Sequence, residues 1–414
     1  MDVFRELLCE IERIPAVDVH SHVRAAAPGA SELSQIALCY PVSSELESAG
    51  VAPASLEADS LNGGPDQARA VFQRIRNTTS YWCLAQILLD LYGAQPPHEQ
   101  DAADLAGKVK QSAVRPEWAN EVLERANVSK VFVTCDWRKP LPKASERFVC
   151  VLRVDGLVNE AHVPRTLESL GETTGRSVYE AGDLKKGVDE LFSRAKECGA
   201  VAAAVSFEPH VEFEPGDRDA ADRALSLVLL GQKAGRDDRK SLRSYVLDQV
   251  LRNCAEHDMP MQLMVGVKQL RSSDRTLPAY EPGTAAICAD LFERHSRVKF
   301  DVFTSNETIC HELAAAARNY PNVTLSGAWW YLAYPAHIRK ILRERIEMLP
   351  MTKCCALVSD ARCVEWVYGR AKLIRHELAL TLAELVREEY LSKDAALDVA
   401  AHYLAENPKS IYGL

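Results

Sequence analysis

Two histidines lie two residues apart near the start of the chain, directly after a short apolar run. The segment reads Asp18-Val19-His20-Ser21-His22. On an extended backbone, side chains at i and i+2 point to the same side, so both imidazoles can reach one divalent metal ion. A polar loop with a chance pair is the alternative, since the chain has 11 histidines. The position at the end of a predicted strand favours the metal site.

An aspartate near the other end of the chain could supply a third metal ligand. Asp360 follows the apolar run CCALVS and belongs to the segment SDAR. If this run and the first one are neighbouring strands of a closed barrel, Asp360 lies beside His20 and His22. The alternative is that Asp360 caps the helix that follows, and both roles can be partly true. We therefore predict one metal site formed by His20, His22 and Asp360.

Other polar or aromatic residues also follow apolar runs. Arg153 ends the run FVCVLR and precedes Asp155 by two residues, so it is either a clamp for a carboxylate or phosphate or half of an internal ion pair. Lys268 follows the run MQLMVG. Trp329 and Trp330 follow VTLSGA, and because neighbouring residues of a strand alternate faces, one of them could line a pocket. A core position is the usual one for tryptophan.

The short apolar runs themselves read as parallel strands that are buried on both faces. Most are separated by segments with helical period, such as LRSYVLDQVLRNCAEH. Eight such strands alternating with helices predict an α/β fold, a closed (β/α)8 TIM barrel of the metal-dependent hydrolase type, with catalytic groups at the C-terminal ends of its strands. An open, doubly wound sheet is the competing architecture. The runs cover residues 15–20, 130–136, 148–153, 201–207, 261–266, 298–303, 323–330 and 354–360.

The interval between the first and second runs is too long for a barrel connection. It contains helical patterns such as SYWCLAQILLDLYG. We therefore predict a helical insertion over residues 29–125, packed on a catalytic barrel domain formed by residues 1–28 and 126–414. The tail from Arg370 to Leu414 is also helical in pattern and is expected to supply the last helices of the barrel.

Several residue types that a second metal ion would need are missing. Binuclear hydrolases on such barrels use a bridging lysine on the fourth strand and histidines on the fifth and sixth strands. Here the fourth run ends in Val-Ser-Phe (205–207), the fifth offers Met264, and the sixth ends in Phe-Thr-Ser (303–305). At most one metal ion can be bound by such a set. The sequence also has no P-loop, dinucleotide-binding glycine pattern or nucleophile elbow.

Composition and charge argue against several kinds of binding partner and of cellular location. The formal net charge of −9 argues against nucleic-acid or membrane-surface partners, whereas a small anionic substrate could still bind a locally positive pocket. The N-terminal segment reads as an amphipathic helix with acidic residues rather than as a signal peptide, and no run is long enough to span a bilayer. Twelve cysteines without framework spacing indicate reduced core residues of a cytoplasmic protein.

Together these motifs resemble the uronate isomerases, the divergent isomerase branch of the amidohydrolase superfamily. The strongest segment runs from Leu325 to about Arg375, where SGAWWY, HIRKILRERIEMLPM and SDAR followed by a helix have the family's order and spacing. The D-x-H-x-H start and the segments TTSYWCLAQILLDLYG, ANVSKVFVTCD and RFVCVLRVDGLVNE are also similar. The last of these, with AAAVSFEP and MQLMVGVK, resembles a shorter branch that acts on hexuronates such as galacturonate.

The chain departs from the main branch of that family at two places. It has Met264 where the main branch has a histidine near the end of the fifth strand, and it has Val205 and Ser206 where the main branch has an Asp-His pair. The shorter branch shares these losses. A family tyrosine of the insertion is expected to reach the site, and Tyr40 is the nearest match.

The resemblance implies an aldose-ketose isomerase. It would convert D-glucuronate to D-fructuronate, or D-galacturonate to D-tagaturonate, by ring opening and proton transfer from C2 to C1 through an enediol. One divalent metal ion is implied, zinc with manganese as the alternative, and a homo-oligomer is compatible with the sequence. The implied site comprises the metal ligands His20, His22 and Asp360, the catalytic residues Asp360, Arg362 and Tyr40, and the substrate-binding residues Arg153, Lys268, Trp329 and Trp330.

Two other functions remain open at this point. The first is a mononuclear, metal-dependent amidohydrolase or decarboxylase on the same barrel, although the base histidine expected on the fifth or sixth strand is missing. The second is a non-catalytic binder of sugar acids that has lost part of the site. The presence of His20, His22, Asp360 and Arg362 together counts against the second.

Overall fold

Eight parallel strands form one sheet that closes nearly into a barrel. The computed structural model describes residues 2–51, 71–95, 102–143, 145–209, 211–270 and 275–414. Strands of the sheet lie side by side in their order along the chain, which confirms the predicted TIM barrel rather than a doubly wound sheet. They are β1 (Ala16–Ser21), β2 (Val128–Asp136), β3 (Phe148–Arg153), β4 (Ala202–Ser206), β5 (Met261–Val265), β8 (Phe300–Thr304), β9 (Val323–Ser326) and β10 (Cys354–Cys355).

The last two strands are shorter than their apolar runs predict. β9 ends at Ser326 and β10 at Cys355. Gly327 directly follows β9 with left-handed backbone, at φ 46°, and such a residue cannot continue a strand. Asp360, the last residue of the eighth apolar run, is also left-handed, at φ 53°. The apolar pattern also does not predict a short antiparallel hairpin after β5, formed by β6 (Val267–Gln269) and β7 (Thr276–Pro278).

β1 is held on both of its edges. On one edge it pairs in parallel with β2, with Ala16 opposite Val128 and Ser21 opposite Val133. On the other edge it bonds to residues 357–361, which follow β10. These bonds run from Val19 N to Leu357 O at 3.2 Å, from Asp360 N to His20 O at 3.0 Å and from His22 N to Ala361 O at 2.8 Å. The first strand and the segment after the last one therefore lie side by side, as a closed barrel requires.

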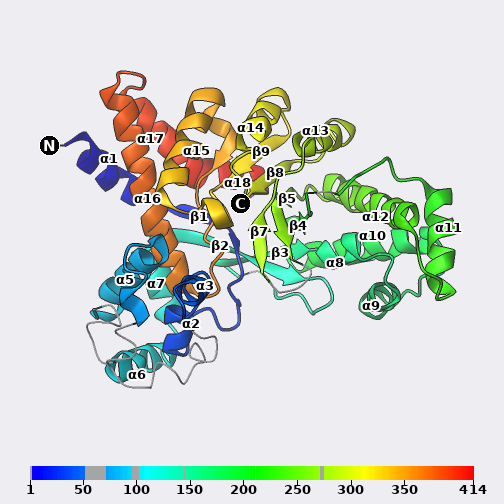
Figure 1. Cartoon of the computed structure of the whole chain (residues 1–414), viewed down its shortest axis with the longest axis horizontal. Helices are drawn as coiled ribbons and strands as arrows, with labels where there is room; N and C mark the ends of the chain where they lie inside the picture. The colour runs from blue at the N-terminus through cyan, green and yellow to red at the C-terminus, as the bar shows by residue number, and fades with distance from the viewer. Residues whose placement is uncertain (1, 52–70, 96–101, 144, 210, 271–274) are drawn as a thin grey trace. The chain divides into compact units, whose positions relative to one another are not determined.

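The chain divides into two compact units. The first comprises Met1–Val133, Tyr334–Arg339 and Leu357–Leu404. Within it the long helix α16 packs against α1, α5 and α7 (Figure 1). Its helices are α1 (Val3–Glu12), α2 (Leu33–Ala37), α3 (Val42–Ser48), α5 (Thr79–Tyr92), α6 (Ala102–Ala113), α7 (Trp118–Arg125), α16 (Val364–Arg387) and α17 (Lys393–Ala401).

The described segments between β1 and β2 are helical, as the sequence predicts. In α5, for example, the Thr78 hydroxyl accepts a hydrogen bond from Tyr81 N at 3.2 Å and begins the helix, and Gly93 ends it in a left-handed conformation. Residues 52–70 and 96–101 of the predicted insertion lie outside the described residues. The division into an insertion at 29–125 and a barrel domain stays a prediction.

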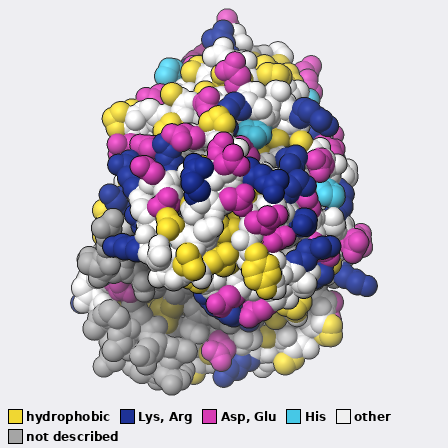
Figure 2. All heavy atoms as spheres, turned by 90° about the vertical axis from the view of Figure 1, so that its right-hand side faces the viewer, with side chains coloured by type: hydrophobic (Ala, Val, Ile, Leu, Met, Phe, Trp, Pro, Cys, Tyr) yellow, Lys and Arg dark blue, Asp and Glu magenta, His cyan; other side chains and the backbone are white. Residues whose placement is uncertain are grey.

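The second unit comprises Thr134–Ala333, Lys340–Ala356 and Ala405–Leu414. On the face of the molecule that Figure 2 shows, acidic and basic side chains are interspersed. The helices of this unit are α8 (Asp155–Asn159), α9 (Pro164–Thr174), α10 (Ala181–Glu197), α11 (Arg218–Leu229), α12 (Arg236–Glu256), α13 (Thr284–Arg294), α14 (Cys310–Asn319) and α18 (Asn407–Tyr412), and α15 (Pro335–Met348) has residues in both units.

None of the helices in the described ranges is both long enough and apolar enough to cross a membrane. All twelve cysteines lie in described residues and are free thiols. Most of them are buried, among them Cys354 and Cys355 of β10, in line with the predicted core positions.

A buried polar network joins the C-terminal helix α18 to three strands of the second unit. Tyr412 donates its hydroxyl to Asp301 of β8 and accepts a hydrogen bond from Gln262 of β5 at 2.9 Å. Ser326 of β9 also donates to Asp301, at 2.7 Å. Burial raises the pKa of Asp301 to about 6, although the two hydroxyl donors act in the opposite direction. The last residues of the chain therefore stabilise a charge inside the barrel wall.

Replacing Tyr412 by Phe tests this network. Asp301 is mostly ionised at pH 8 and mostly protonated at pH 5, because its folded pKa is about 6. A donor to a carboxylate stabilises the charged form, so its loss costs more at the higher pH. We expect Tyr412→Phe to lower the stability by about 1–3 kcal/mol at pH 8 and by less at pH 5.

Urea unfolding midpoints at the two pH values measure the effect. Tyr390→Phe is the matched control, since the Tyr390 side chain is 54% exposed. An equal loss at both pH values would show that the hydroxyl does not act through the charge of Asp301.

Candidate metal centre and its cavity

The structure brings His20, His22 and Asp360 together in the first unit. Asp360 Oδ1 lies 3.4 Å from His20 Nε2 and 3.3 Å from His22 Nε2. The two imidazole rings are nearly perpendicular, with centroids 5.2 Å apart. One candidate ligand atom from each residue lies within 4.8 Å of the other two. β1 supplies His20 directly, and the backbone bonds between β1 and residues 357–361 bring Asp360 beside it.

This geometry fits a single metal ion. Ligands at about 2.0–2.1 Å from a tetrahedral zinc ion are separated by about 3.4 Å, close to both observed nitrogen–oxygen distances. Asp360 Oδ1 is buried and accepts no hydrogen bond from the described residues. A buried carboxylate oxygen without a donor is costly unless a cation is bound beside it. The donor set of two imidazoles and one carboxylate is also a typical one for zinc.

Asp360 is ionised in this surrounding. Burial by itself would raise its pKa, but the imidazoles of His20 and His22 outweigh burial and hold the pKa well below the usual range. The carboxylate does not cap the following helix, because α16 begins at Val364 with Cys363 as its N-cap. Its left-handed backbone is a conformation that aspartate tolerates better than most residues. The alternative of a helix-capping aspartate is therefore wrong.

The side chain of Asp18 is bonded to both segments that carry the candidate metal ligands. Its carboxylate accepts hydrogen bonds from the hydroxyl and the backbone N–H of Ser359, at 2.5 and 2.9 Å, and from His20 N at 3.4 Å. The side chain is fully buried, and burial raises its pKa to about 7 against the effect of these donors. Asp18 therefore links β1, which carries His20, to the residue that precedes Asp360.

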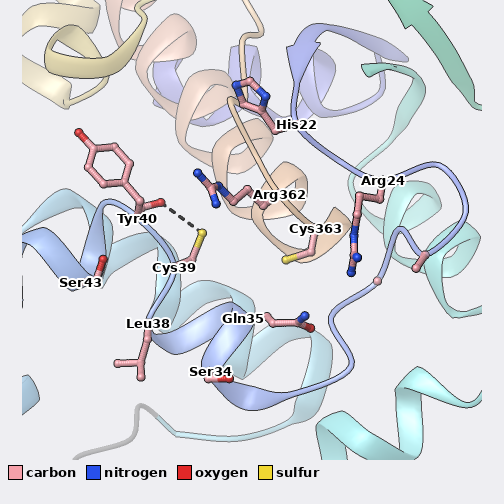
Figure 3. Close-up of a pocket in the computed structure, with 12 residues that line it drawn as sticks. His22, Arg24, Ser34, Gln35, Leu38, Cys39, Tyr40, Ser43, Arg362 and Cys363 are labelled. Atoms are coloured by element: carbon pink, nitrogen blue, oxygen red, sulfur yellow. Dashed lines mark hydrogen bonds between the residues drawn. The ribbon is translucent and has the colours of Figure 1, made fainter. Parts of the chain in front are cut away.

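A cavity of about 760 Å³ opens beside His22, entirely within the first unit. Arg362 and Tyr40, both predicted to be catalytic, line it together with His22 (Figure 3). The extended geometry expected between Asp360 and Arg362 is wrong, since Asp360 has positive φ, yet Arg362 still faces this cavity. Its lining residues are His22, Arg24, Ala27, Gly29, Ser34, Gln35, Leu38, Cys39, Tyr40, Ser43, Arg362 and Cys363.

The loop that forms one wall of the cavity is tied to α16 by a buried acid. Glu365 accepts hydrogen bonds from Ala30 N at 3.1 Å, from the Tyr92 hydroxyl at 3.0 Å and from Trp118 Nε1 at 2.9 Å. These donors come from the loop after β1, from α5 and from α7. One carboxylate, three residues after Arg362, thus holds three separate segments of the first unit in register.

The structure shows the partners of Arg153, for which the sequence left two roles open. Its guanidinium group bonds to Asp155 through Nε at 2.7 Å and through a terminal nitrogen at 3.3 Å, and it also donates to Ser206 Oγ at 3.1 Å. The ion pair with Asp155, one of the two alternatives for Arg153, is thus present, and a role of Arg153 in substrate binding stays a prediction. A carboxylate ligand would have to compete with Asp155.

The remaining predicted substrate-binding residues lie in the second unit. Lys268 is exposed on β6. The rings of Trp329 and Trp330 contact each other, with centroids 5.4 Å apart, because Trp330 has a positive φ and begins a short 3-10 helix, η3 (Trp330–Leu332). The expectation that they alternate across a strand is wrong. Trp329 is buried and Trp330 partly exposed, and their roles stay predictions.

The sequence interpretation missed several residues of the cavity. Arg24 continues the period-two series of Asp18, His20 and His22, so the spacing alone could have indicated it. Gln35 sits on α2, in a segment where the sequence shows no such pattern. Cys39 is next to Tyr40, and burial raises the pKa of its thiol to about 11, so it is uncharged at neutral pH.

We expect one divalent metal ion per chain to bind at the centre. Removing a direct ligand should weaken zinc binding by more than about a hundredfold, since even outer partners of ligands contribute about 10–100-fold. His22→Ala and Asp360→Ala are the test variants, measured by competition with a chromogenic chelator. His311→Ala is the control, because the His311 side chain is 73% exposed and pairs with Glu344. Undiminished affinity in both ligand variants would rule out this site.

Comparisons with known proteins give the same fold over the whole chain. A protein named uronate isomerase from Rhizorhabdus wittichii is 25% identical over 451 residues, covering 100% of this chain and 95% of the relative. The crystal structure of a uronate isomerase from Thermotoga maritima matches with a TM-score of 0.87 at 17% identity, covering 99% of this chain and 97% of that one. That of a glucuronate isomerase from Caulobacter crescentus matches with a TM-score of 0.86 at 17% identity, covering 99% and 94%.

No family model matches the chain. The resemblance to the uronate isomerases that the motifs indicate thus extends over the full length of the chain, in sequence as well as in fold.

Proposed function

We propose that the chain is a uronate isomerase that interconverts an aldohexuronate and its ketohexuronate. The observation that carries the proposal is the cavity of the first unit, which His22 of the candidate metal site lines together with Arg362 and Tyr40. The likeness to proteins named uronate isomerase supports it. D-glucuronate and D-galacturonate are the substrates we propose, and the twelve free thiols support a cytoplasmic enzyme.

The proposed reaction needs no redox partner. After the ring opens, the hydrogen on C2 leaves as a proton, its electron pair forms the C1–C2 double bond, and the aldehyde oxygen gains a proton. The hydroxyl on C2 of the enediol then loses its proton, the C2 carbonyl forms, and C1 gains a proton. The site must therefore move protons over a short distance and stabilise negative charge on the two neighbouring oxygens.

The residues of the first unit suit these tasks. Asp360 is a carboxylate at neutral pH, the form needed to accept the proton of the anomeric hydroxyl during ring opening. Arg362 forms no ion pair within the described residues, so its guanidinium fork can bind the enediolate oxygens. We assign the transfer of a proton to Tyr40, which lines the same cavity. A divalent ion bound by His20, His22 and Asp360, zinc or manganese, would polarise the substrate oxygens.

The first test is the reaction itself. Incubated with zinc or manganese, the protein should form the ketose from D-glucuronate or D-galacturonate, with exchange of the C2 hydrogen in deuterium oxide, followed by NMR. His22→Ala should abolish the conversion, and His311→Ala should leave it intact. If metal binds but neither hexuronate gives a ketose, the isomerase proposal fails; release of carbon dioxide or of an amine would then favour a decarboxylase or an amidohydrolase.

The second test is Arg362→Lys. Lysine keeps the charge but loses the planar fork that can contact both oxygens of an enediolate. Because that charge develops only in the transition state, we expect kcat to fall at least about a hundredfold, equivalent to about 2.7 kcal/mol. The metal content should not change. Arg318→Lys, at an exposed position on α14, is the matched control, and near-normal kcat for Arg362→Lys would make Arg362 a structural residue.

A further inference from the structure

Helix α12 of the second unit carries five basic residues, and acids neutralise only three of them. The three ion-paired residues are Arg236 with Glu212, Lys240 with Glu212 and Glu214, and Arg252 with Asp189 and Glu256. The other two, Arg239 and Arg243, form no ion pair within the described residues. The helix therefore carries two guanidinium groups whose charge the protein leaves uncompensated.

Arg243 is the more unusual of the two because it is partly buried. Its Nε atom is buried, and its side chain donates no hydrogen bond to any part of the chain that the structure describes. Burial lowers the pKa of Arg243 and the charge of Arg239 lowers it further, whereas Glu208 acts in the opposite direction. A guanidinium group withdrawn from water without a partner costs free energy, and a bound anion would offset that cost.

A histidine lies near the two arginines. Arg239 and Arg243 are four residues apart on α12, so their side chains lie on the same face of the helix. Helix α8 packs against α12, and His162 follows the end of α8 by three residues. Burial lowers the pKa of His162, and the charges of Arg239 and Arg243 lower it further, as three neighbouring side chains require. The group is partly open to solvent, since Arg239 is exposed and the other two are half-buried.

We propose that Arg239, Arg243 and His162 form a binding site for a small phosphate-bearing anion, either inorganic phosphate or a phosphate monoester. Each guanidinium group can bind two phosphate oxygens, and the imidazole can donate a further hydrogen bond. Glu208 offsets one of the two positive charges, and a dianion gains more from two guanidinium forks than a monocarboxylate does. The site lies in the second unit, shares no residue with the cavity beside His22, and does not depend on the proposed isomerase activity.

Calorimetric titration of the protein with inorganic phosphate tests the site. We expect Arg243→Met to weaken phosphate binding at least about tenfold, as for the loss of a charge-assisted hydrogen bond. Arg252→Met is the matched control, because Arg252 lies on the same helix but is paired with acids, and its phosphate affinity should stay within about twofold of the wild type. His22→Ala, which lacks a ligand of the candidate metal centre, should also bind phosphate normally. Loss of phosphate binding in His22→Ala would place the anion at the metal centre and overturn the proposal.

Thermal unfolding separates an anion site from a structural role of Arg243. Methionine keeps the apolar stem of the side chain and removes a partly buried charge, so Arg243→Met without phosphate should unfold at the temperature of the wild type or higher. Phosphate should raise the melting temperature of the wild type but not that of Arg243→Met, because a ligand stabilises only the folded protein that binds it. A variant that is destabilised without phosphate, and that gains as much from phosphate as the wild type, would show that Arg243 is structural.

Two further ligands identify the kind of anion. D-glucose 6-phosphate carries the same dianionic group, so tighter binding than that of inorganic phosphate would identify a phosphate monoester as the ligand, and weaker binding would identify inorganic phosphate. D-glucuronate, a monocarboxylate, should not displace phosphate. Displacement by D-glucuronate would show that these arginines bind the proposed substrate, and a wild type that binds neither phosphate compound would show that there is no anion site; either result overturns the proposal.

Discussion

The buried oxygen of Asp360 is the constraint on which the site depends. A carboxylate that faces two imidazoles and accepts no hydrogen bond at its buried oxygen, among the residues described, is unfavourable unless positive charge is supplied. A metal ion bound by the three residues would supply it. The lowered pKa of Asp360, which the two imidazoles cause, likewise shows that its charged form needs stabilising neighbours. Binding of a divalent ion should therefore stabilise the folded first unit as well as complete the site.

Such a centre requires a rigid frame, and two other buried acids of the first unit provide it. Asp18 links β1 to Ser359, so that the histidines and Asp360 cannot move independently. Glu365 ties α16 to the loop at Ala30 and to two helices, which fixes the cavity wall next to Arg362. Both carboxylates are satisfied by donors of the protein, whereas Asp360 is not. Buried carboxylates thus serve two purposes in the first unit: those that accept hydrogen bonds from the protein hold its segments together, and the one whose buried oxygen accepts none is available to a cation.

Sequence periodicity predicts those parts of this protein in which the backbone is regular. The run FVCVLR became β3 without change of bounds, and the i, i+2 spacing correctly predicted that His20, on β1, and His22, directly after it, lie close together. Prediction failed where single residues leave the extended region. Positive φ at Gly327 directly follows the end of β9 at Ser326, and positive φ at Trp330 accompanies the contact between the two tryptophan rings. The sequence pattern also could not decide between the two roles of Arg153, because an ion pair between residues i and i+2 depends on side-chain rotamers, which residue spacing does not specify.

The distribution of unpaired charge in the first unit agrees better with isomerisation than with hydrolysis. A hydrolase must deprotonate water and stabilise one developing oxyanion, for which a metal ion and one base are sufficient. An enediol route develops charge on two adjacent oxygens and returns every proton to the substrate, so a forked cation gains more than an additional base. Arg362 has that geometry and no competing acid in the described lining of the cavity.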